Sequence, residues 1–596
     1  MLKLPYGISN FYQIRTEGYY YLDRTHLIPE LEAAGKQLIF LRPRRFGKSL
    51  LLSTLEHYYD INQSSNFNAL FGELAIGQQP TDEHNRYLVL RWDFSAISGI
   101  GSSADIKASL FNYLTITLKN FTHYYQDLIT SSFDFYPNDA LASLQAVLSA
   151  VKASGHAVYL LIDEYDNFAN EILINKDKGP ERYKELLSGE GIFKTLFKII
   201  KAQSTEGNLA RVFITGVSPL VLSDMTSGYN VATNIFLDVR FHELCGIAHD
   251  ELAQLVADII KQCPAPADQT HLLATLQQYY NGYRFSYDLS KPRLYNPTLC
   301  FYFLQYYQLN CEMPFEMLDG NLAMDASRIE YMMQLPAGRD VIAQILDEQN
   351  PISLKHLITQ FGVDKLAELN NNPDYMASLL YFFGVLTLVD IQGLRKMILK
   401  APNLVVQALY IDEFKRYLLP ESKERRHLQR IVEDFYQSGN LEPLANYLES
   451  KTLQSLSNRD YQWSNELTIK MAFLTPLFDD SYYMIDSEAN LGRRYSDLIM
   501  IVRYSLRESL PSLYDFILEF KYLKLGDLNL TAEQIKQIPR QDLAQLPLVQ
   551  NTLNQALTQL VDYRNTINSR YNEPQRLICI AVVALGFDRI VWQRLD

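Results

Sequence analysis

The sequence has few cysteines and no long apolar run. Five cysteines are spread over 596 residues without a C-x-x-C pair, so neither a zinc site nor a disulfide is indicated, and reduced thiols are expected. No stretch reaches the roughly 20 apolar residues that a membrane-spanning helix requires. The N-terminus also lacks the apolar segment of a secretory signal. We therefore expect a cytoplasmic protein that does not enter a membrane.

An excess of positive charge is also missing. The net charge of −13 argues against a surface coated with basic patches for nucleic acid. A local groove is still allowed, because phosphate binding needs only a few well-placed lysines and arginines. The length of 596 residues exceeds what one hydrophobic core supports, so three or four domains are expected.

A glycine is absent from the start of an otherwise recognisable phosphate-binding loop. The octet Arg42–Ser49, RPRRFGKS, follows the apolar run Leu38–Leu41 and leads into the helix-compatible run Leu50–Leu55. Strand, loop, Gly-Lys-Ser and helix is the arrangement in which backbone N–H groups and a helix N-terminus hold phosphate oxygens. Lys48 would reach the β- and γ-phosphates, and the Ser49 hydroxyl would ligate Mg²⁺. The alternative is a basic strand-to-helix turn.

The second half of such a site is an apolar strand that ends in acid. Val158–Ile162 is a continuous apolar run, typical of a buried parallel strand, and Asp163 and Glu164 follow it directly. Asp163 would hold Mg²⁺ and Glu164 would polarise the attacking water. The alternative is a core strand that meets solvent with two charges.

A third apolar run, Arg211–Gly216, suggests a strand between the two motifs. Thr215 is the candidate to sense the γ-phosphate there, with Ser218 as the second choice. An ordinary Thr-Gly turn after a strand is the alternative.

These segments resemble a known family. LIFLRPRRFGKSLLLSTL, YLLIDEYDN, FITGVSPL and YNGYRFS are similar to the AAA-ATPase-like proteins of bacteria, over roughly Leu4 to Phe303. In that family the loop usually reads RPRRFGKS, so Arg42 follows the family pattern. The resemblance implies ATP binding and slow hydrolysis, and Arg284 in a helical lid as a sensor arginine; a structural arginine stacked between Tyr283 and Phe285 is the alternative. The residues expected to contact ATP are Arg44, Arg45, Phe46, Gly47, Lys48, Ser49, Leu50, Asp163, Thr215 and Arg284.

A second group of chemical residues lies near the C-terminus. Asp497 precedes the apolar strand Leu498–Val502, and Glu519 and Lys521 follow the run Tyr514–Leu518. Residues i and i+2 of a strand point to the same side, so Glu519 and Lys521 are expected to share a pocket. Carboxylates from two strands can hold Mg²⁺, and Lys521 could orient or deprotonate a metal-bound water.

Two flanking helices complete this predicted site. Glu466 precedes the helical run Leu467–Leu477, which can carry it to the metal. Gln559 and Tyr563 are spaced i, i+4, so they share one helix face that could touch the substrate backbone. The expected metal ligands are Ser49 and Asp163 in the first site and Glu466, Asp497 and Glu519 in the second.

The C-terminal series resembles the PD-(D/E)XK nuclease superfamily. The pattern E…G-R-x-x-D…E-x-K…Q-x-x-x-Y contains extra residues before Asp497, so Arg494 rather than Arg493 would take the place of the motif arginine. The resemblance implies a restriction-endonuclease-like α/β domain. An exposed acidic pair with a solvated lysine, and a degenerate copy that does not cut, are the alternatives.

The predicted fold class is α/β in four parts. These are a P-loop ATPase core with a parallel sheet (1–245), a helical lid (246–310), a helical middle region (311–425) and a nuclease-like domain (426–596). A hairpin over 385–399 in the middle region is either the wing of a winged-helix module or a surface hairpin on a helical linker.

The function expected from these parts is an ATP-binding and ATP-hydrolysing switch or motor coupled to Mg²⁺-dependent cleavage of nucleic acid, DNA or RNA. The alternatives are a nucleotide-dependent scaffold or sensor with a non-cutting nuclease-like domain, and an ATPase that remodels nucleic acid. A homo-oligomer is expected if a neighbour supplies an arginine, for which Arg211 and Arg240 are the candidates.

Overall fold

The chain folds into two compact units, each described here by itself. The computed structural model describes residues 1–99, 101–167, 185–186, 191–220, 231–263, 269–314, 316–317, 332, 335–345, 351–361, 371–393, 395–418, 422–453, 465–479, 481–486, 498–571 and 573–595. The first unit comprises Met1–Cys311, Gln334–Val341 and Ile352–Asn403, and the second comprises Glu312–Met333, Ile342–Pro351 and Leu404–Asp596. The four predicted domain boundaries stay a prediction.

A five-stranded parallel sheet forms the centre of the first unit. Its strands are ordered β2-β3-β4-β1-β5, and every neighbouring pair is parallel. β1 is buried along almost its whole length on both faces, which explains its continuous apolar sequence. The strand bounds are β1 Gln37–Leu41, β2 Leu88–Asp93, β3 Val158–Asp163, β4 Leu209–Gly216 and β5 Thr233–Asn234.

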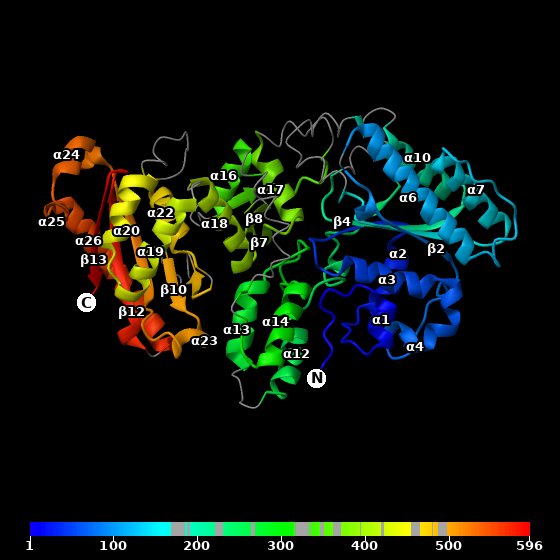
Figure 1. The fold of residues 1–596 in the computed structure, drawn as a ribbon, viewed down its shortest axis with the longest axis horizontal. Coiled ribbons are helices and arrows are strands. Elements are labelled where there is room, and N and C mark those ends of the chain that lie inside the picture. Colours follow the sequence, from blue (N-terminus) through cyan, green and yellow to red (C-terminus); the bar gives the residue numbers. More distant parts are fainter. Residues whose placement is uncertain are drawn as a thin grey trace. The chain divides into compact units, whose positions relative to one another are not determined.

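Helices cover both faces of this sheet, and Figure 1 shows α1 to α4 on one face and α6, α7 and α10 on the other. Leu38 and Phe40 of β1 share a core with Leu52 and Leu55 of α3. The helix bounds are α1 Phe11–Thr16, α2 Ile28–Ala34, α3 Lys48–Tyr59, α4 Phe67–Phe71, α5 Ala75–Gln78, α6 Ser103–Tyr124, α7 Ala140–Ala153 and α10 Ile192–Thr205.

Three helices follow the sheet, α12 (His249–Ile260), α13 (Gln269–Tyr280) and α14 (Pro297–Asn310), and their role as a lid stays a prediction. A disulfide joins Cys263, after α12, to Cys311, which caps α14, with 5.7 Å between their Cα atoms. The expectation that the cysteines form no disulfide is therefore wrong. The two partners lie 48 residues apart, and packing of α12 against α14 brings them together, so their spacing in the sequence gave no indication.

A small antiparallel sheet completes the first unit. β6 (Ile352–Leu354), β7 (Thr387–Gln392) and β8 (Lys396–Lys400) are ordered β6-β8-β7. The predicted hairpin is thus confirmed, and with α17 (Pro373–Phe382) it forms what we call the α17–β8 module, residues 352–361, 371–393 and 395–403. Residues 375–382 of α17 are all buried, so this helix is not free to enter a nucleic-acid groove. The choice between a winged helix and a surface hairpin stays open.

The second unit is a mixed five-stranded sheet in the order β13-β12-β11-β10-β9. β11 and β12 are parallel, and the other neighbours are antiparallel. The strand bounds are β9 Tyr483–Asp486, β10 Leu498–Val502, β11 Asp515–Leu523, β12 Leu577–Leu585 and β13 Arg589–Leu595.

Alternate residues of β11 face different helices. Phe516 stacks on Phe435 of α19 and Phe520 packs on Phe473 of α22, so the even-numbered side chains face these two helices. α26 also packs on β11 and β12. The helix bounds are α18 Leu404–Leu418, α19 Ser422–Ser438, α20 Glu442–Tyr447, α22 Asn465–Leu477, α23 Tyr504–Arg507, α24 Ala532–Gln537, α25 Arg540–Ala544 and α26 Pro547–Tyr571; α16, Pro336–Ile345, crosses the division between the units.

The predicted fold class is confirmed, with a parallel N-terminal sheet, a helical middle and a C-terminal α/β sheet. Among the described helices, none combines the length and apolarity that crossing a membrane would require.

Candidate functional sites

The predicted phosphate loop joins β1 to α3. α3 begins at Lys48, and the ammonium of Lys48 donates hydrogen bonds of 2.9 Å to the carbonyl oxygens of Arg42 and Pro43. Gly47 has a φ of +96° and Arg45 a φ of +65°, so the chain turns sharply into the helix. Phe46 is buried, and Arg44, Arg45, Ser49 and Leu50 are half-buried. The loop therefore has the strand–turn–helix form that the sequence predicted.

Lys48 is buried close to acidic residues. Its side chain is 5% exposed, and burial lowers the pKa of its ammonium while Asp163, Glu164 and Asp166 act in the opposite direction. The structure thus brings the lysine of the first predicted motif to the acids of the second.

Arg42 explains why the loop begins without glycine. Its guanidinium lies between the rings of Phe40 and Phe285, 4.3 Å from each centroid. It donates to the carbonyl oxygens of Leu41 at 2.8 Å, Phe236 at 2.8 Å and Phe241 at 2.7 Å. Burial lowers its pKa to about 10. Arg42 therefore fixes the base of the loop to residues 236–241, a contact that glycine cannot make.

The end of β3 carries the predicted acids. Asp163 is 1% exposed and accepts hydrogen bonds from the hydroxyl of Thr215 at 2.6 Å and the N–H of Glu164 at 3.0 Å. β4 lies between β1 and β3, as expected, so Thr215 stands between the two motifs. Burial raises the pKa of Glu164. Ser218, the second choice as sensor, donates instead to Asp166 at 2.7 Å.

Sequence reasoning missed Arg91 at this site. Its guanidinium lies 4.0 Å from a carboxylate oxygen of Asp163 and 2.8 Å from Glu56 of α3. The residue lies inside β2, next to β3. The apolar sequence of β2 carries no signal for this contact.

The three candidate arginines have other partners. The guanidinium of Arg284 donates to the carbonyl of Lys291 at 3.2 Å, and its role as a sensor stays a prediction. Tyr283 and Phe285 stack on each other, 6.3 Å between centroids, rather than around Arg284. Arg211 lies near the start of β4, at the far end of the sheet from the loop, and Arg240 is 47% exposed.

Arg211 is unsuited to reach a neighbouring subunit, which corrects that candidate. It is 6% exposed and forms an ion pair with Glu83, and it also donates to the carbonyl of Gly35 at 3.0 Å. Arg240 pairs with Asp238 at 2.6 Å.

In the second unit, Glu519 and Lys521 lie on the same side of β11. Glu519 is 2% exposed, and the ammonium of Lys521 donates to its carboxylate at 2.9 Å. Phe520 faces α22 on the other side, as expected. The sequence placed these residues at the end of their strand, whereas β11 continues to Leu523 because Phe520 and Leu523 keep pairing with β12.

The predicted helix face is present on α26. Tyr563 is 2% exposed. The side-chain oxygen of Gln559 is buried and has no hydrogen-bond partner among the described residues. A buried acceptor without a partner is uncommon, and the contact of Gln559 with a substrate stays a prediction.

The remaining predicted ligands are described only in part. Asp497 lies outside the described residues. Glu466 lies in the first turn of α22, and its side chain is outside the described part. Among the side chains that are described, no group of three or more His, Cys, Asp or Glu could hold a metal ion.

The strand order and the loop define a P-loop ATPase-like fold in the first unit. Residues 5–226 match the family model described as a predicted AAA-ATPase, and residues 464–593 match that of the PD-(D/E)XK nuclease superfamily. The architecture expected from the sequence, an AAA-ATPase-like domain followed by a nuclease-superfamily domain, is confirmed by these two matches.

Individual relatives are more distant. The chain is 29% identical over 296 residues to an uncharacterized protein in the vnfD 5′ region of Azotobacter chroococcum mcd 1, and the match covers 50% of each. The chain thus spans about half the length of this curated relative.

Two solved structures are weakly similar. The Walker-type ATPase PABY2304 of Pyrococcus abyssi is 13% identical with a TM-score of 0.38, over 65% of this chain and 96% of its own. The Orc1 protein of Aeropyrum pernix, solved in complex with DNA, is 10% identical with a TM-score of 0.25, over 66% of this chain and 93% of its own.

Proposed function

We propose that this protein is an ATP-dependent switch or motor coupled to Mg²⁺-dependent cleavage of nucleic-acid phosphodiesters. The observation that carries the proposal is that each unit places a lysine beside buried acids, Lys48 near Asp163 and Lys521 on Glu519. Lysine and carboxylate together are the side chains that manage phosphate and magnesium.

The first site fits a nucleoside triphosphate. The ammonium of Lys48 is bound only to loop carbonyls in the contacts described above, so phosphate oxygens can replace them without breaking a direct ion pair. Ser49 and Asp163 would hold Mg²⁺, which neutralises phosphate charge when bound. Glu164, with its raised pKa, would accept the proton of the attacking water. Thr215 would orient Asp163 and sense the γ-phosphate.

The second site fits a scissile phosphate. Glu519, with Asp497 and Glu466, would hold Mg²⁺, which lowers the pKa of a bound water. Leu498 of β10 pairs with Leu518 of β11. In the sequence, Asp497 comes directly before Leu498 and Glu519 directly after Leu518, so each acid is the sequence neighbour of one member of this pair. Lys521 would orient or deprotonate the water, while Gln559 and Tyr563 touch the substrate backbone.

A basic helix face supports nucleic acid as the partner of this acidic chain. Lys423, Arg426 and Arg430 of α19 are exposed, and their spacing of three and four residues places them on one face over roughly 10 Å. None of the three has an ion-pair partner in the described part of the chain. Lys423, in the first turn of α19, opposes the helix dipole, so helix stability does not account for this lysine. A phosphate backbone would be a suitable partner for the basic face.

The location and assembly of the protein belong to the same proposal. A cytoplasmic location stays an expectation from the sequence, and the Cys263–Cys311 disulfide, a bond that is rare in a reducing cytosol, speaks against it. A homo-oligomer is retained as an expectation, with Arg240 as the remaining candidate for a residue supplied to a neighbour.

Degradation assays test the cleavage half. Plasmid, single-stranded DNA and RNA are incubated with Mg²⁺ and wild-type protein, Glu519→Gln or the matched control Glu533→Gln, an exposed acid in the first turn of α24. We expect wild type and Glu533→Gln to shorten at least one substrate and Glu519→Gln to leave it intact. Equal cutting by all three would reject the assignment. Retained ATP binding with no cutting by wild type would favour the scaffold alternative.

A further inference from the structure

The motif Asn281–Phe285, which the sequence analysis singled out, lies between the phosphate loop and the α17–β8 module. On the loop side, Tyr283 and Phe285 pack edge-on against Phe46, with ring centroids 4.8 and 5.2 Å away. Phe285 also supports the guanidinium of Arg42. This segment, which we call the strap, therefore touches both ends of the loop.

On its other side the strap is hydrogen-bonded to the module. The hydroxyl of Tyr381 donates to the carbonyl of Arg284 at 2.9 Å, and the N–H of Arg284 donates to the hydroxyl of Thr387 at 3.0 Å. The amide of Asn403 donates to the carbonyl of Asn281 at 2.8 Å. The contacts come from α17, β7 and the end of the module, so the strap is held along its length.

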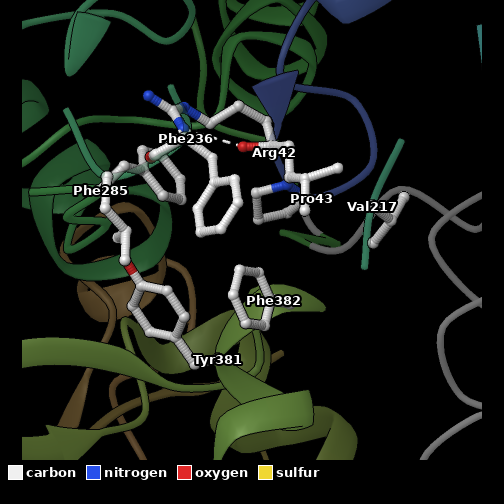
Figure 2. Close-up of a pocket in the computed structure, with 9 residues that line it drawn as sticks. Arg42, Pro43, Val217, Phe236, Phe285, Tyr381 and Phe382 are labelled. Carbon is white, nitrogen blue, oxygen red and sulfur yellow. Dashed lines mark hydrogen bonds between the residues drawn. The ribbon is translucent and has the colours of Figure 1, made fainter. Parts of the chain in front are cut away.

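The module also touches the loop directly. A Cβ added to Gly384, which follows α17, would lie 2.6 Å from the Cγ atom of Pro43. Pro43 is one of the two residues whose carbonyl holds Lys48. Figure 2 shows the rings of Phe285, Tyr381 and Phe382 directed at one small pocket beside Pro43. Because the interior is closely packed, the α17–β8 module cannot shift against Pro43 without moving it.

We propose that the α17–β8 module positions the phosphate loop, and that Gly384 and Tyr381 are positioning residues for ATP. The inference rests on the proposed binding of ATP at Lys48. Any shift of Gly384 moves Pro43, and with it the carbonyl against which the Lys48 ammonium is held. By thermodynamic reciprocity, ATP must then alter the seating of the module to the same extent that the module alters the affinity for ATP.

Two glycines of the module provide a matched pair for the test. Gly384 has a φ of +76° and Gly393, in the β7–β8 turn, has a φ of +49°, so alanine strains the backbone at both. An added Cβ meets Pro43 at Gly384 and meets nothing within 4 Å at Gly393. The two variants thus share the backbone strain and differ in the contact with the loop.

The affinity for a non-hydrolysable ATP analogue is measured by titration on the full chain. We expect Gly384→Ala to weaken binding about tenfold and Gly393→Ala to change it by less than about twofold. Pro43→Gly removes both atoms that the new Cβ meets, the Cγ at 2.6 Å and the Cβ at 2.7 Å, so Gly384→Ala should cost less affinity in the Pro43→Gly background than in wild type. Melting temperatures of all variants are recorded alongside, because relief of the clash also restores stability, and a positioning role requires a loss of affinity at a temperature where every variant is folded.

The possible outcomes distinguish a failure of ATP binding from a failure of the positioning role. If wild type does not bind the analogue, the ATP half of the proposed function fails, and this inference fails with it. If wild type binds and the two glycine variants bind equally, the positioning role is overturned while ATP binding stands. If Gly384→Ala does not fold, Tyr381→Phe decides, because it removes only the hydrogen bond to Arg284. If Tyr381→Phe lowers the affinity for the analogue by about threefold or more, the inference is supported, because the module and the loop are then coupled. An unchanged affinity overturns it.

Discussion

The two lysine–acid sites are built differently, and the difference bears on how each would work. Lys48 is held by two backbone carbonyls and feels its acids at longer range, whereas Lys521 is bonded directly to the carboxylate of Glu519 at 2.9 Å. A ligand can exchange with carbonyls and leave the acids as they are. A cation that enters the second site must compete with an ammonium already on the carboxylate. If the proposed function holds, the first site is prearranged for phosphate, and at the second a metal ion or substrate must separate the Lys521–Glu519 pair.

The largest expected effect tests the Lys48 site. Lys48→Ala should weaken binding of ATP by about 30-fold or more, because loss of a buried charged partner costs about 2–5 kcal/mol. Isothermal titration with a non-hydrolysable analogue measures it. Lys36→Ala, an exposed lysine just before β1, is the control and should bind as wild type does. Equal binding by the two variants would mean that the loop does not hold the nucleotide.

The next prediction concerns the pH dependence of the stability of the first unit. His242 is buried beside the strap, where its Nδ1 accepts from the N–H of Phe285 and its Nε2 donates to the carbonyl of Pro292. Burial, with smaller contributions from Arg42 and other nearby cations, lowers its pKa from 6.5 to about 4. The unfolded chain therefore binds more protons between these values. Stability is full above pH 6.5 and falls by up to about 3 kcal/mol as the pH drops to 4.

Urea unfolding of wild type and His242→Gln across this pH range measures the effect. The variant cannot protonate at this position, so its unfolding free energy should depend less on pH between 4 and 6.5. Parallel slopes for the two proteins would show that His242 is not held neutral.

The smallest expected effect concerns the second site. Lys521→Ala leaves the carboxylate of Glu519 buried without its ammonium and should lower the unfolding free energy of the second unit by about 1–2 kcal/mol. Mg²⁺ should then raise the melting temperature of the variant more than that of wild type, because the cation replaces the missing charge. Lys524→Ala, an exposed lysine just after β11, is the control. A Mg²⁺ shift no larger than that of wild type would contradict the idea that Glu519 belongs to a metal site.

Local pattern was enough for the parts of each site that depend on neighbours in sequence. The continuous apolar runs predicted β1, β3 and β10, and the i, i+2 rule placed Glu519 and Lys521 on one side of a strand. Arg91, the Cys263–Cys311 pair and the contact of Gly384 with Pro43 were missed. Each of these depends on which elements pack together, and a single sequence carries no record of that packing.

The arginine at the start of the phosphate loop has a consequence for protein engineering. Arg42 contacts two aromatic rings and donates to four backbone carbonyls, and water does not compete for them, since Arg42 is 1% exposed. Replacing it with the glycine of the common motif would leave a cavity and remove the Arg42 donor from four carbonyls. In this chain, Arg42→Gly would bring the sequence closer to the common motif of a nucleotide-binding loop and would remove the side chain that holds the loop in place.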